Sequence, residues 1–277
     1  MTTDAPTAEQ IRAAWDALAP GFDANVSPYT LRLGEDIIDR LDVGPGTRVL
    51  DVAAGSGALA IPAARRGAPT VAVDIAPTMI ERLAARAEAE GLSNLRGRVM
   101  DGTALEFPDN TFDVSVSLNG VSLFPDLDGG LAELVRVTKP GGRVAVVAFG
   151  AIQRTEFVAF FMSAIKTAVS GVTPPLDPPP LPFQVSDPEK LRSKLVQAGL
   201  TAVRTETATW EGRFRSASHY WDTVTSSNPI AVQLISGLTA EQRDSVLRVL
   251  DGMLRERSGG DPGAVLHNDI TIGIGTK

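Results

Sequence analysis

The chain contains no cysteine among its 277 residues, and histidine occurs only twice. The absence of cysteine excludes disulfide bonds, thiolate metal sites and a cysteine nucleophile. No apolar run reaches the roughly 18 residues that a membrane-spanning helix needs, and the first residues lack the basic and then apolar pattern of a secretory signal. We therefore expect a cytoplasmic protein without membrane insertion and without a metal site.

Positive charge is also in short supply. The formal net charge is −7 and the isoelectric point lies near 5.0. The densest basic stretches, Arg65-Arg66 and Arg96-Gly97-Arg98, are short and are typical of a solvated surface. Because binding to nucleic acid relies on clustered lysine and arginine, no nucleic-acid partner is expected.

What the chain does have is a turn of small residues between two short apolar runs. The run Val49–Val52 leads into Ala53, Gly55 and Gly57, and the run that starts at Thr70 ends in Asp74. A small-residue turn lets backbone approach a ligand closely, and a carboxylate at the next strand end can accept hydrogen bonds from a ribose. The third glycine of a dinucleotide-binding turn is missing, because position 60 is alanine, but the spacing alone leaves the nucleoside open.

Three further motifs follow in order: Met100–Thr103, Glu106–Leu118, and the segment Glu133–Val147 with its Lys139-Pro140-Gly141-Gly142 element. Together with the glycine turn, these motifs resemble the class I S-adenosylmethionine (SAM)-dependent methyltransferases. Within them, the small-molecule branch with the ubiquinone- and menaquinone-biosynthesis enzymes is the most similar. The resemblance is strong over residues 45–150. It implies SAM as cofactor, S-adenosylhomocysteine (SAH) as product, and speaks against a nicotinamide oxidoreductase.

The resemblance also implies roles for the first two motifs. Asp51 would lie near the methionine ammonium of SAM, and Ala53, Gly55 and Gly57 would let the backbone lie against its aminocarboxypropyl group. Asp74 would accept hydrogen bonds from both ribose hydroxyls. Each acid has a plainer interpretation: Asp51 could cap the backbone of the turn, and Asp74 could cap the following helix.

The adenine end is assigned in the same way. Ile75 and Met79 would pack against the adenine ring, although core packing would explain either residue nearly as well. Asp101, Gly102 and Thr103 match the segment that recognises adenine in the family, where an acid accepts from the exocyclic amine. The alternative is a simple turn carboxylate.

Catalysis needs little from side chains, because the methyl group of a sulfonium is already activated and in-line approach is the main requirement. Asn119 matches the position beside the sulfonium and could contact the methyl group or a substrate hydroxyl, or only close a turn. His219 and His267 are weak candidates for a general base. We assign no catalytic residue.

The alternation of strand and helix predicts an α/β fold, a doubly wound and mostly parallel seven-stranded sheet with N-terminal helices and an inserted helical cap between residues 216 and 260. We expect a single domain over 1–277, with a helical lid (1–44), a SAM-binding core (45–150), and a cap with the C-terminal strands (151–277). A proline-rich run at 174–182 is typical of an extended loop. The final strands are expected near 202–210 and 270–274.

The resulting prediction is a SAM-dependent methyltransferase that acts on O, N or C of a small, fairly apolar metabolite. An RNA methyltransferase and a SAM-binding sensor without turnover are the alternatives. Substrate-side residues are expected among aromatic and apolar side chains of the N-terminal helices, the segment after the fourth strand, and the cap: Trp15, Phe22, Tyr29, Leu123, Phe124, Phe160, Phe161, Trp210, Phe214, Tyr220 and Trp221. The N-terminal helices could form a lid or a homodimer contact.

Overall fold

The computed structural model describes residues 6–169, 180–227 and 229–277. The strands are β1 (Val49–Val52), β2 (Thr70–Asp74), β3 (Leu95–Val99), β4 (Phe112–Leu118), β5 (Thr138–Phe149), β6 (Thr201–Phe214) and β7 (Ala264–Thr276). The α-helices are α1 (Ala8–Asn25), α2 (Ser27–Arg40), α3 (Ala60–Arg65), α4 (Pro77–Ala89), α5 (Leu127–Val137), α6 (Glu156–Ala168), α7 (Pro188–Gln197), α8 (Ala217–Thr225), α9 (Pro229–Ile235) and α10 (Ala240–Ser258). Short 3₁₀ turns lie at Val121–Leu123, Ile152–Arg154 and Leu181–Phe183.

The strands form one seven-stranded sheet in the order β3-β2-β1-β4-β5-β7-β6. Strands β1 to β5 run parallel, and β7 runs antiparallel to both of its neighbours. The predicted α/β fold class is confirmed. The strand order reverses between β1 and β4, and a sheet of this kind opens a crevice outside the carboxyl ends of the strands at that point.

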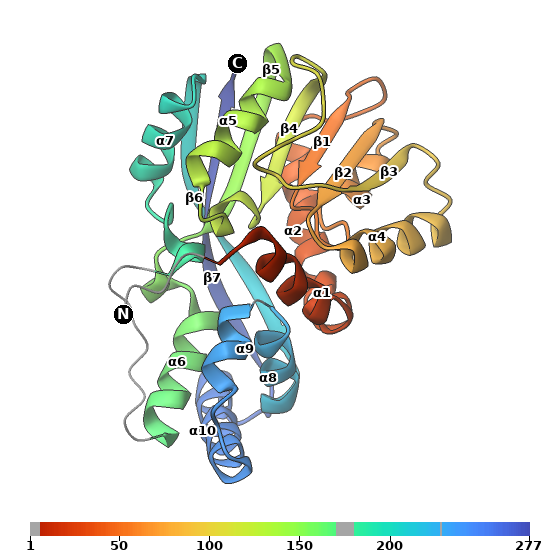
Figure 1. Ribbon diagram of the computed structural model, residues 1–277. Helices are drawn as coiled ribbons and strands as arrows, with labels where there is room; N and C mark the ends of the chain where they lie inside the picture. The colour runs from red at the N-terminus through yellow and green to blue at the C-terminus, as the bar shows by residue number, and fades with distance from the viewer. Residues whose placement is uncertain (1–5, 170–179, 228) are drawn as a thin grey trace.

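Helices cover both faces of the sheet (Figure 1). On one face α5 and α7 pack against the sheet, burying Leu134 and Leu195 with Leu50 and Val146. On the other face α2 and α3 pack against β1, β4 and β5, with Ile37 fully buried. Parallel strands that are covered on both sides bury nearly every residue, and this is why β1, apart from Asp51, and most of β4 consist of apolar or small residues.

Strands β6 and β7 are much longer than the alternation in the sequence suggested. Pairing between β5 and β7 stops at Phe149 and Ile270, whereas β6 and β7 remain paired as far as Phe214 and Ala264. The extension leaves the sheet as a two-stranded ribbon that enters the cap (Figure 1). Its apolar side chains pack into a separate core with α6, α8 and α10, so the cap supports the part of β6 and β7 that extends beyond β5.

The cap itself follows the prediction: α8, α9 and α10 lie between β6 and β7. The N-terminal helices also form where expected, and Thr7 and Gln10 make the predicted capping box at the start of α1. Helix α1 lies at the junction of sheet and cap (Figure 1). Of the proline-rich run, residues 174–179 lie outside the described residues. Among the helices that are described, none is both long and apolar enough to cross a membrane.

Gly34 allows α2 to pack directly on the turn after β1. A Cβ atom at this position would lie 1.8 Å from the carbonyl oxygen of Ala58. Since overpacking costs about 1–3 kcal/mol, we expect Gly34→Ala to lower the free energy of unfolding by that amount or more, measured by urea denaturation. Gly252→Ala on the exposed side of α10, where nothing lies within 4 Å of the new atom, should instead raise it by about 0.5–1 kcal/mol. Equal stability of the two variants would contradict this packing.

Candidate active site

The turn after β1 is held in a conformation that suits small residues. Ala53, Gly55 and Gly57 all have left-handed backbone, with φ of 57°, 53° and 100°. A Cβ at Gly57 would lie 2.8 Å from the side chain of Ile61, so glycine is required there. The ring of Phe22 in α1 lies 3.6 Å from the place of a Cβ at Gly55. The turn therefore lies beneath α1.

Asp74 joins this turn to the next one. Its Oδ2 accepts a hydrogen bond of 2.8 Å from Gly55 N–H, and its Oδ1 accepts one of 3.0 Å from Ala76 N–H. The residue is only 8% exposed, and burial raises the pKa of its carboxyl to about 6 against the opposing effect of these hydrogen bonds. The N-cap of α4 is Ala76, not Asp74. Each carboxylate oxygen keeps a further lone pair for a ligand.

Asp51 lies deeper than Asp74. Its Oδ2 accepts a hydrogen bond of 3.0 Å from Ala60 N–H in the first turn of α3. The residue is 1% exposed, and burial raises the pKa of its carboxyl to about 8. Asp51 is not among the residues that line the cavity described below. This geometry favours the capping interpretation, and contact with a methionine ammonium would have to be indirect.

The residues predicted to contact adenine, Asp101, Gly102 and Thr103, form a turn after β3. Asp101 Oδ1 accepts hydrogen bonds from the backbone N–H and the hydroxyl of Thr103, at 2.8 and 2.7 Å. Gly102 lies so close to Val52 and to the ring of Phe124 that a Cβ there would be 2.6–2.8 Å from them.

A single cavity of about 340 Å³ connects these residues. Ten of the predicted cofactor residues line it, or lie in the turn beneath it. Those that line it are Ala53, Gly55, Asp74, Ile75, Met79, Asp101, Gly102, Thr103 and Asn119. Gly57 lies in the same turn as Ala53 and Gly55. We call the end at Asp74 and Asp101 the nucleoside end. From there the cavity continues between α1, α2 and the ribbon of β6 and β7, where its second end is more apolar.

Asn119 follows the carboxyl end of β4 and lines the cavity. Its backbone is left-handed, with φ of 52°, a conformation that asparagine tolerates better than most residues. Its Oδ1 is buried and has no hydrogen-bond partner within the described structure, and the same holds for the hydroxyl oxygen of Ser122. Strain and unsatisfied polar atoms at one turn are features that concentrate at functional sites.

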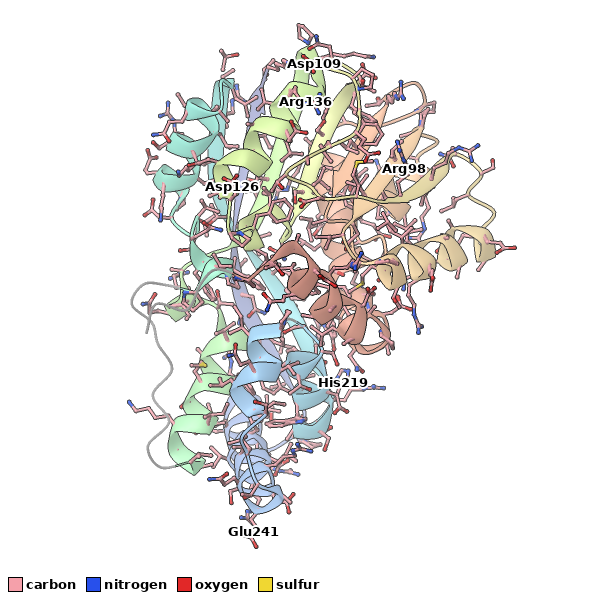
Figure 2. The ribbon with its side chains drawn as sticks, in the orientation of Figure 1. Arg98, Asp109, Asp126, Arg136, His219 and Glu241 are labelled. Atoms are coloured by element: carbon pink, nitrogen blue, oxygen red, sulfur yellow. The ribbon has the colours of Figure 1, made fainter. Side chains whose placement is uncertain are left out.

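The two histidines lie outside the cavity. His219 Nδ1 accepts from Arg215 N–H at 3.2 Å, and its Nε2 lies 3.4 Å from the hydroxyl of Tyr29. Burial, together with Arg215, lowers the pKa of His219. Because Nδ1 accepts from Arg215 N–H, a neutral ring would carry its proton on Nε2 and would have no free lone pair for a substrate. Figure 2 shows His219 on the cap. His267 is exposed beside Glu156 and Arg257.

The second end of the cavity has aromatic walls. Of the predicted substrate-side residues, seven line the cavity as a whole: Trp15, Phe22, Tyr29, Leu123, Phe124, Trp210 and Phe214. Phe22 and Phe124 lie against Gly55 and Gly102 at the other end, whereas the rings of Tyr29, Trp210 and Phe214 contact one another. The other four, Phe160, Phe161, Tyr220 and Trp221, pack in the core of the cap. Sequence reasoning missed Phe149, Phe157 and Asn268, which also line the cavity. Phe149 is the last residue of β5. Asn268 lies in the ribbon extension and accepts from Phe157 N–H, and the alternation pattern did not indicate that extension.

Helix α1 is fixed over the nucleoside end by acidic residues that sequence reasoning did not single out. Asp16 accepts a hydrogen bond of 2.9 Å from Thr78 N–H at the start of α4, an arrangement typical of a helix cap. Asp23 pairs with Arg86 at 2.5 Å and with Arg82 at 3.7 Å. These contacts hold α1 against α4 and close one side of the cavity.

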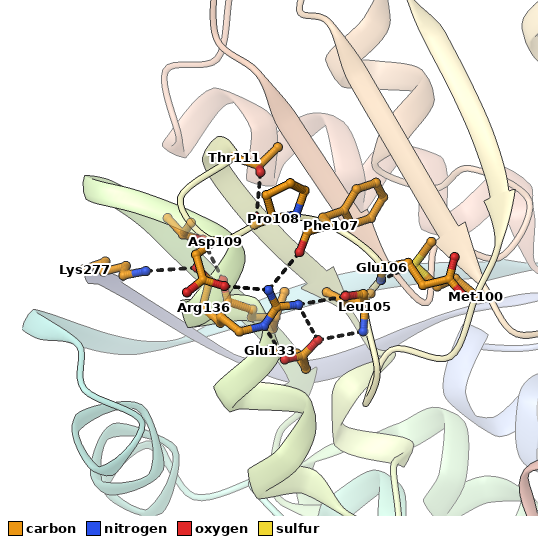
Figure 3. A network of polar contacts seen from close by, with 12 residues as sticks. Met100, Leu105, Glu106, Phe107, Pro108, Asp109, Thr111, Glu133, Arg136 and Lys277 are labelled. Atoms are coloured by element: carbon orange, nitrogen blue, oxygen red, sulfur yellow. Dashed lines mark hydrogen bonds and ion pairs between the residues drawn. The ribbon is translucent and has the colours of Figure 1, made fainter.

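A second polar network holds the loop that follows Asp101 (Figure 3). Arg136 of α5 donates to Glu133, to Asp109 and to the carbonyl oxygens of Leu105 and Phe107, at 2.6–2.8 Å. These interactions raise the pKa of Arg136 and lower that of Glu133. Figure 2 shows Arg136 and Asp109 far from the cap, and neither residue lines the cavity, so the network acts on the loop itself.

Comparison with known proteins agrees with this geometry. Residues 49–142 match the family described as "Methyltransferase domain". A demethylmenaquinone methyltransferase of Renibacterium salmoninarum is 32% identical over 167 residues, which are 57% of this chain and 68% of the relative. The chain belongs to the class I SAM-dependent methyltransferases.

Other relatives of this methyltransferase share a shorter segment. The uncharacterized protein Rv1405c of Mycobacterium tuberculosis is 38% identical over 54% of this chain and 56% of its own length. Nocamycin O-methyltransferase of Saccharothrix syringae is 36% identical over 48% of each chain. The match to these relatives thus spans about half of their length.

Solved structures extend the likeness to the whole fold. The [4+2]-cyclase SpnF superposes with a TM-score of 0.61, covering 99% of this chain and 97% of its own at 19% identity. A likeness at this identity shows the shared fold alone.

The two buried acids make stability depend on pH. Because folding raises the pKa of Asp51 from 3.8 to about 8, the folded state keeps a proton that the unfolded state has lost. The free energy of unfolding should therefore fall as pH rises toward and through 8. Asp51→Asn keeps an acceptor for Ala60 N–H and removes the titration, so its profile should be flatter by more than about 1 kcal/mol.

Urea denaturation of the ligand-free protein across this pH range measures the effect. Asp187→Asn changes an exposed cap of α7 and should leave the profile of the parent protein unaltered. Identical profiles for Asp51→Asn and the parent would show that Asp51 does not hold its proton in the folded state.

Proposed function

We propose that this methyltransferase transfers the methyl group of SAM to an O, N or C atom of a small, fairly apolar acceptor. The cofactor would bind along Ala53, Gly55, Asp74 and the turn at Asp101. The acceptor would bind in the aromatic end of the same cavity. The names of two relatives, a nocamycin O-methyltransferase and a demethylmenaquinone methyltransferase, support a small organic acceptor.

The carboxylate of Asp74 is the observation that carries this proposal. It stands at the end of β2, lines the cavity, and is held by Gly55 and Ala76 so that its remaining lone pairs can face a ligand. Two hydroxyl donors on adjacent carbons match two carboxylate oxygens. The glycine turn beside it gives a ligand close access to backbone, as the aminocarboxypropyl group would require.

SAM, when bound, supplies a methyl group already activated by positive sulfur. The chain's own residues then need to orient the acceptor and exclude water. Helix α1, fixed by Asp16 and Asp23, covers the cavity from one side. The cap covers it from the other. Neither His219 nor His267 lines the cavity, so we propose that positioning carries the reaction without a histidine base.

The alternatives are less well supported. An RNA methyltransferase would need a basic surface near the cavity, whereas the chain carries a net charge of −7. A SAM sensor would bind the cofactor through the same residues as an enzyme but would form no methylated product. The N-terminal helices pack on α4 and on the cap of the same chain, which favours the lid over a dimer contact. We also propose a cytoplasmic location and a single domain that consists of the lid (1–44), the SAM-binding core (45–150) and the cap with the C-terminal strands (151–277).

Asp74→Ala should weaken the binding of SAM and SAH about tenfold or more, because hydrogen bonds to a charged group contribute about 1.5–3 kcal/mol. Calorimetric titration with SAM, SAH and NADH measures this effect. Asp187→Ala, which removes a helix-capping aspartate that does not line the cavity, is the matched control and should bind like the parent protein. Unchanged SAM affinity in Asp74→Ala, or binding of NADH alone, would refute the cofactor assignment.

A further inference from the structure

Four aromatic side chains form a continuous surface at the second end of the cavity, and we call them the aromatic wall: Tyr29, Phe157, Trp210 and Phe214. The rings of Tyr29 and Trp210 meet edge to face at 5.9 Å, and those of Tyr29 and Phe214 stack at 5.6 Å. Phe157 and Phe214 stack at 5.8 Å. All four line the cavity, so a ligand there meets ring faces and edges.

Among the described residues, each of the four that bring a hydroxyl group to this end of the cavity donates its proton to a backbone carbonyl. Tyr29 donates to Arg213 at 2.6 Å, and Thr223 donates to His219 at 2.7 Å. Thr30 donates to Ser27 at 3.4 Å, and Ser227 donates to Val224 at 2.7 Å. No hydroxyl proton of these four residues is therefore left for an anionic ligand.

The charges around the cavity point the same way. Among the described residues that line it there is no lysine, arginine or histidine, whereas three aspartates, Asp74, Asp101 and Asp126, are present. Figure 2 shows Asp126 at one end of α5. The side-chain amides of Asn119 and Asn268 also line the cavity, but they are neutral donors. A buried carboxylate or phosphate that no cation pairs with still costs several kcal/mol. A cationic acceptor would in turn be repelled by the sulfonium that the cofactor brings into the same space.

We propose that the methyl acceptor is an uncharged compound whose apolar body packs on the aromatic wall, and that the cavity rejects anionic analogues of the same shape. This inference rests on the proposed function, because it assigns the second end of the cavity to the acceptor. Tyr29 is central to the selection: its hydroxyl is held by Arg213 and approached by His219 Nε2 at 3.4 Å, so that its ring, and not a free donor, faces the ligand.

The test compares two probes of nearly equal shape, 2-naphthamide and 2-naphthoate, by calorimetric titration of the full chain saturated with SAH. We expect the neutral amide to bind about tenfold or more tightly than the carboxylate. Thr30→Lys places an ammonium group among the residues that line the cavity and should reduce or reverse the preference for the amide over the carboxylate. Thr30→Val removes only the hydroxyl and should leave the preference as it is. Trp210→Ala should weaken the binding of the amide.

Equal or tighter binding of 2-naphthoate to the parent protein would overturn the proposal, as would failure of both probes to bind. The titration with SAH comes first and reports on the cofactor site independently. If SAH does not bind, the proposed function fails. The comparison of the two probes on the SAH-free protein then still shows whether the cavity selects by charge.

Discussion

The hydrogen bonds that Asp74 accepts from Gly55 and Ala76 tie together the turns at the ends of β1 and β2. A buried carboxylate is expensive unless donors surround it, and here the donors are backbone N–H groups of the two segments that must be aligned. Folding therefore leaves an acid at the cavity surface with part of its hydrogen-bonding capacity unused. Burial, together with the nearby charge of Asp16, raises the pKa of Asp74 to about 6 in spite of these donors.

The rest of the cavity depends on this alignment. The reversal of strand order between β1 and β4 opens the crevice, and Asn119, directly after β4, lines the cavity there. Helix α1 can cover the crevice because its own acids bind α4. We infer that the sheet topology shapes the nucleoside end of the cavity, whereas the ribbon of β6 and β7 contributes aromatic side chains to its second end.

The sequence predicted the part of the molecule in which local pattern and tertiary role coincide. Strands that are buried on both faces, such as β1, show as apolar runs, and the residues of the glycine turn must be small for local reasons that are visible in the chain. The extent of β6 and β7 was not predictable in this way. Phe214 and Ala264 pair beyond the sheet because the cap packs on them. The alternation of apolar and polar residues along a strand does not indicate such a long-range contact.

Long-range packing also decides which of the predicted aromatic residues line the cavity and which pack in the core of the cap. Phe160 and Phe161 lie only a few positions from Phe157, yet Phe157 lines the cavity and they pack in the cap. Which side of α6 faces the ligand depends on how the cap sits on the ribbon. Asp51 shows the opposite case, since its type and position suit a ligand contact while its hydrogen bond to Ala60 is a local capping interaction.

A crystal structure of the complex with SAH tests the central claim most directly. The account predicts that both ribose hydroxyls lie within hydrogen-bond distance of the Asp74 carboxylate and that the sulfur faces Asn119 and the aromatic wall. A nucleoside bound elsewhere, or a sulfur atom that faces away from the aromatic wall, would contradict the claim that one cavity serves both cofactor and acceptor.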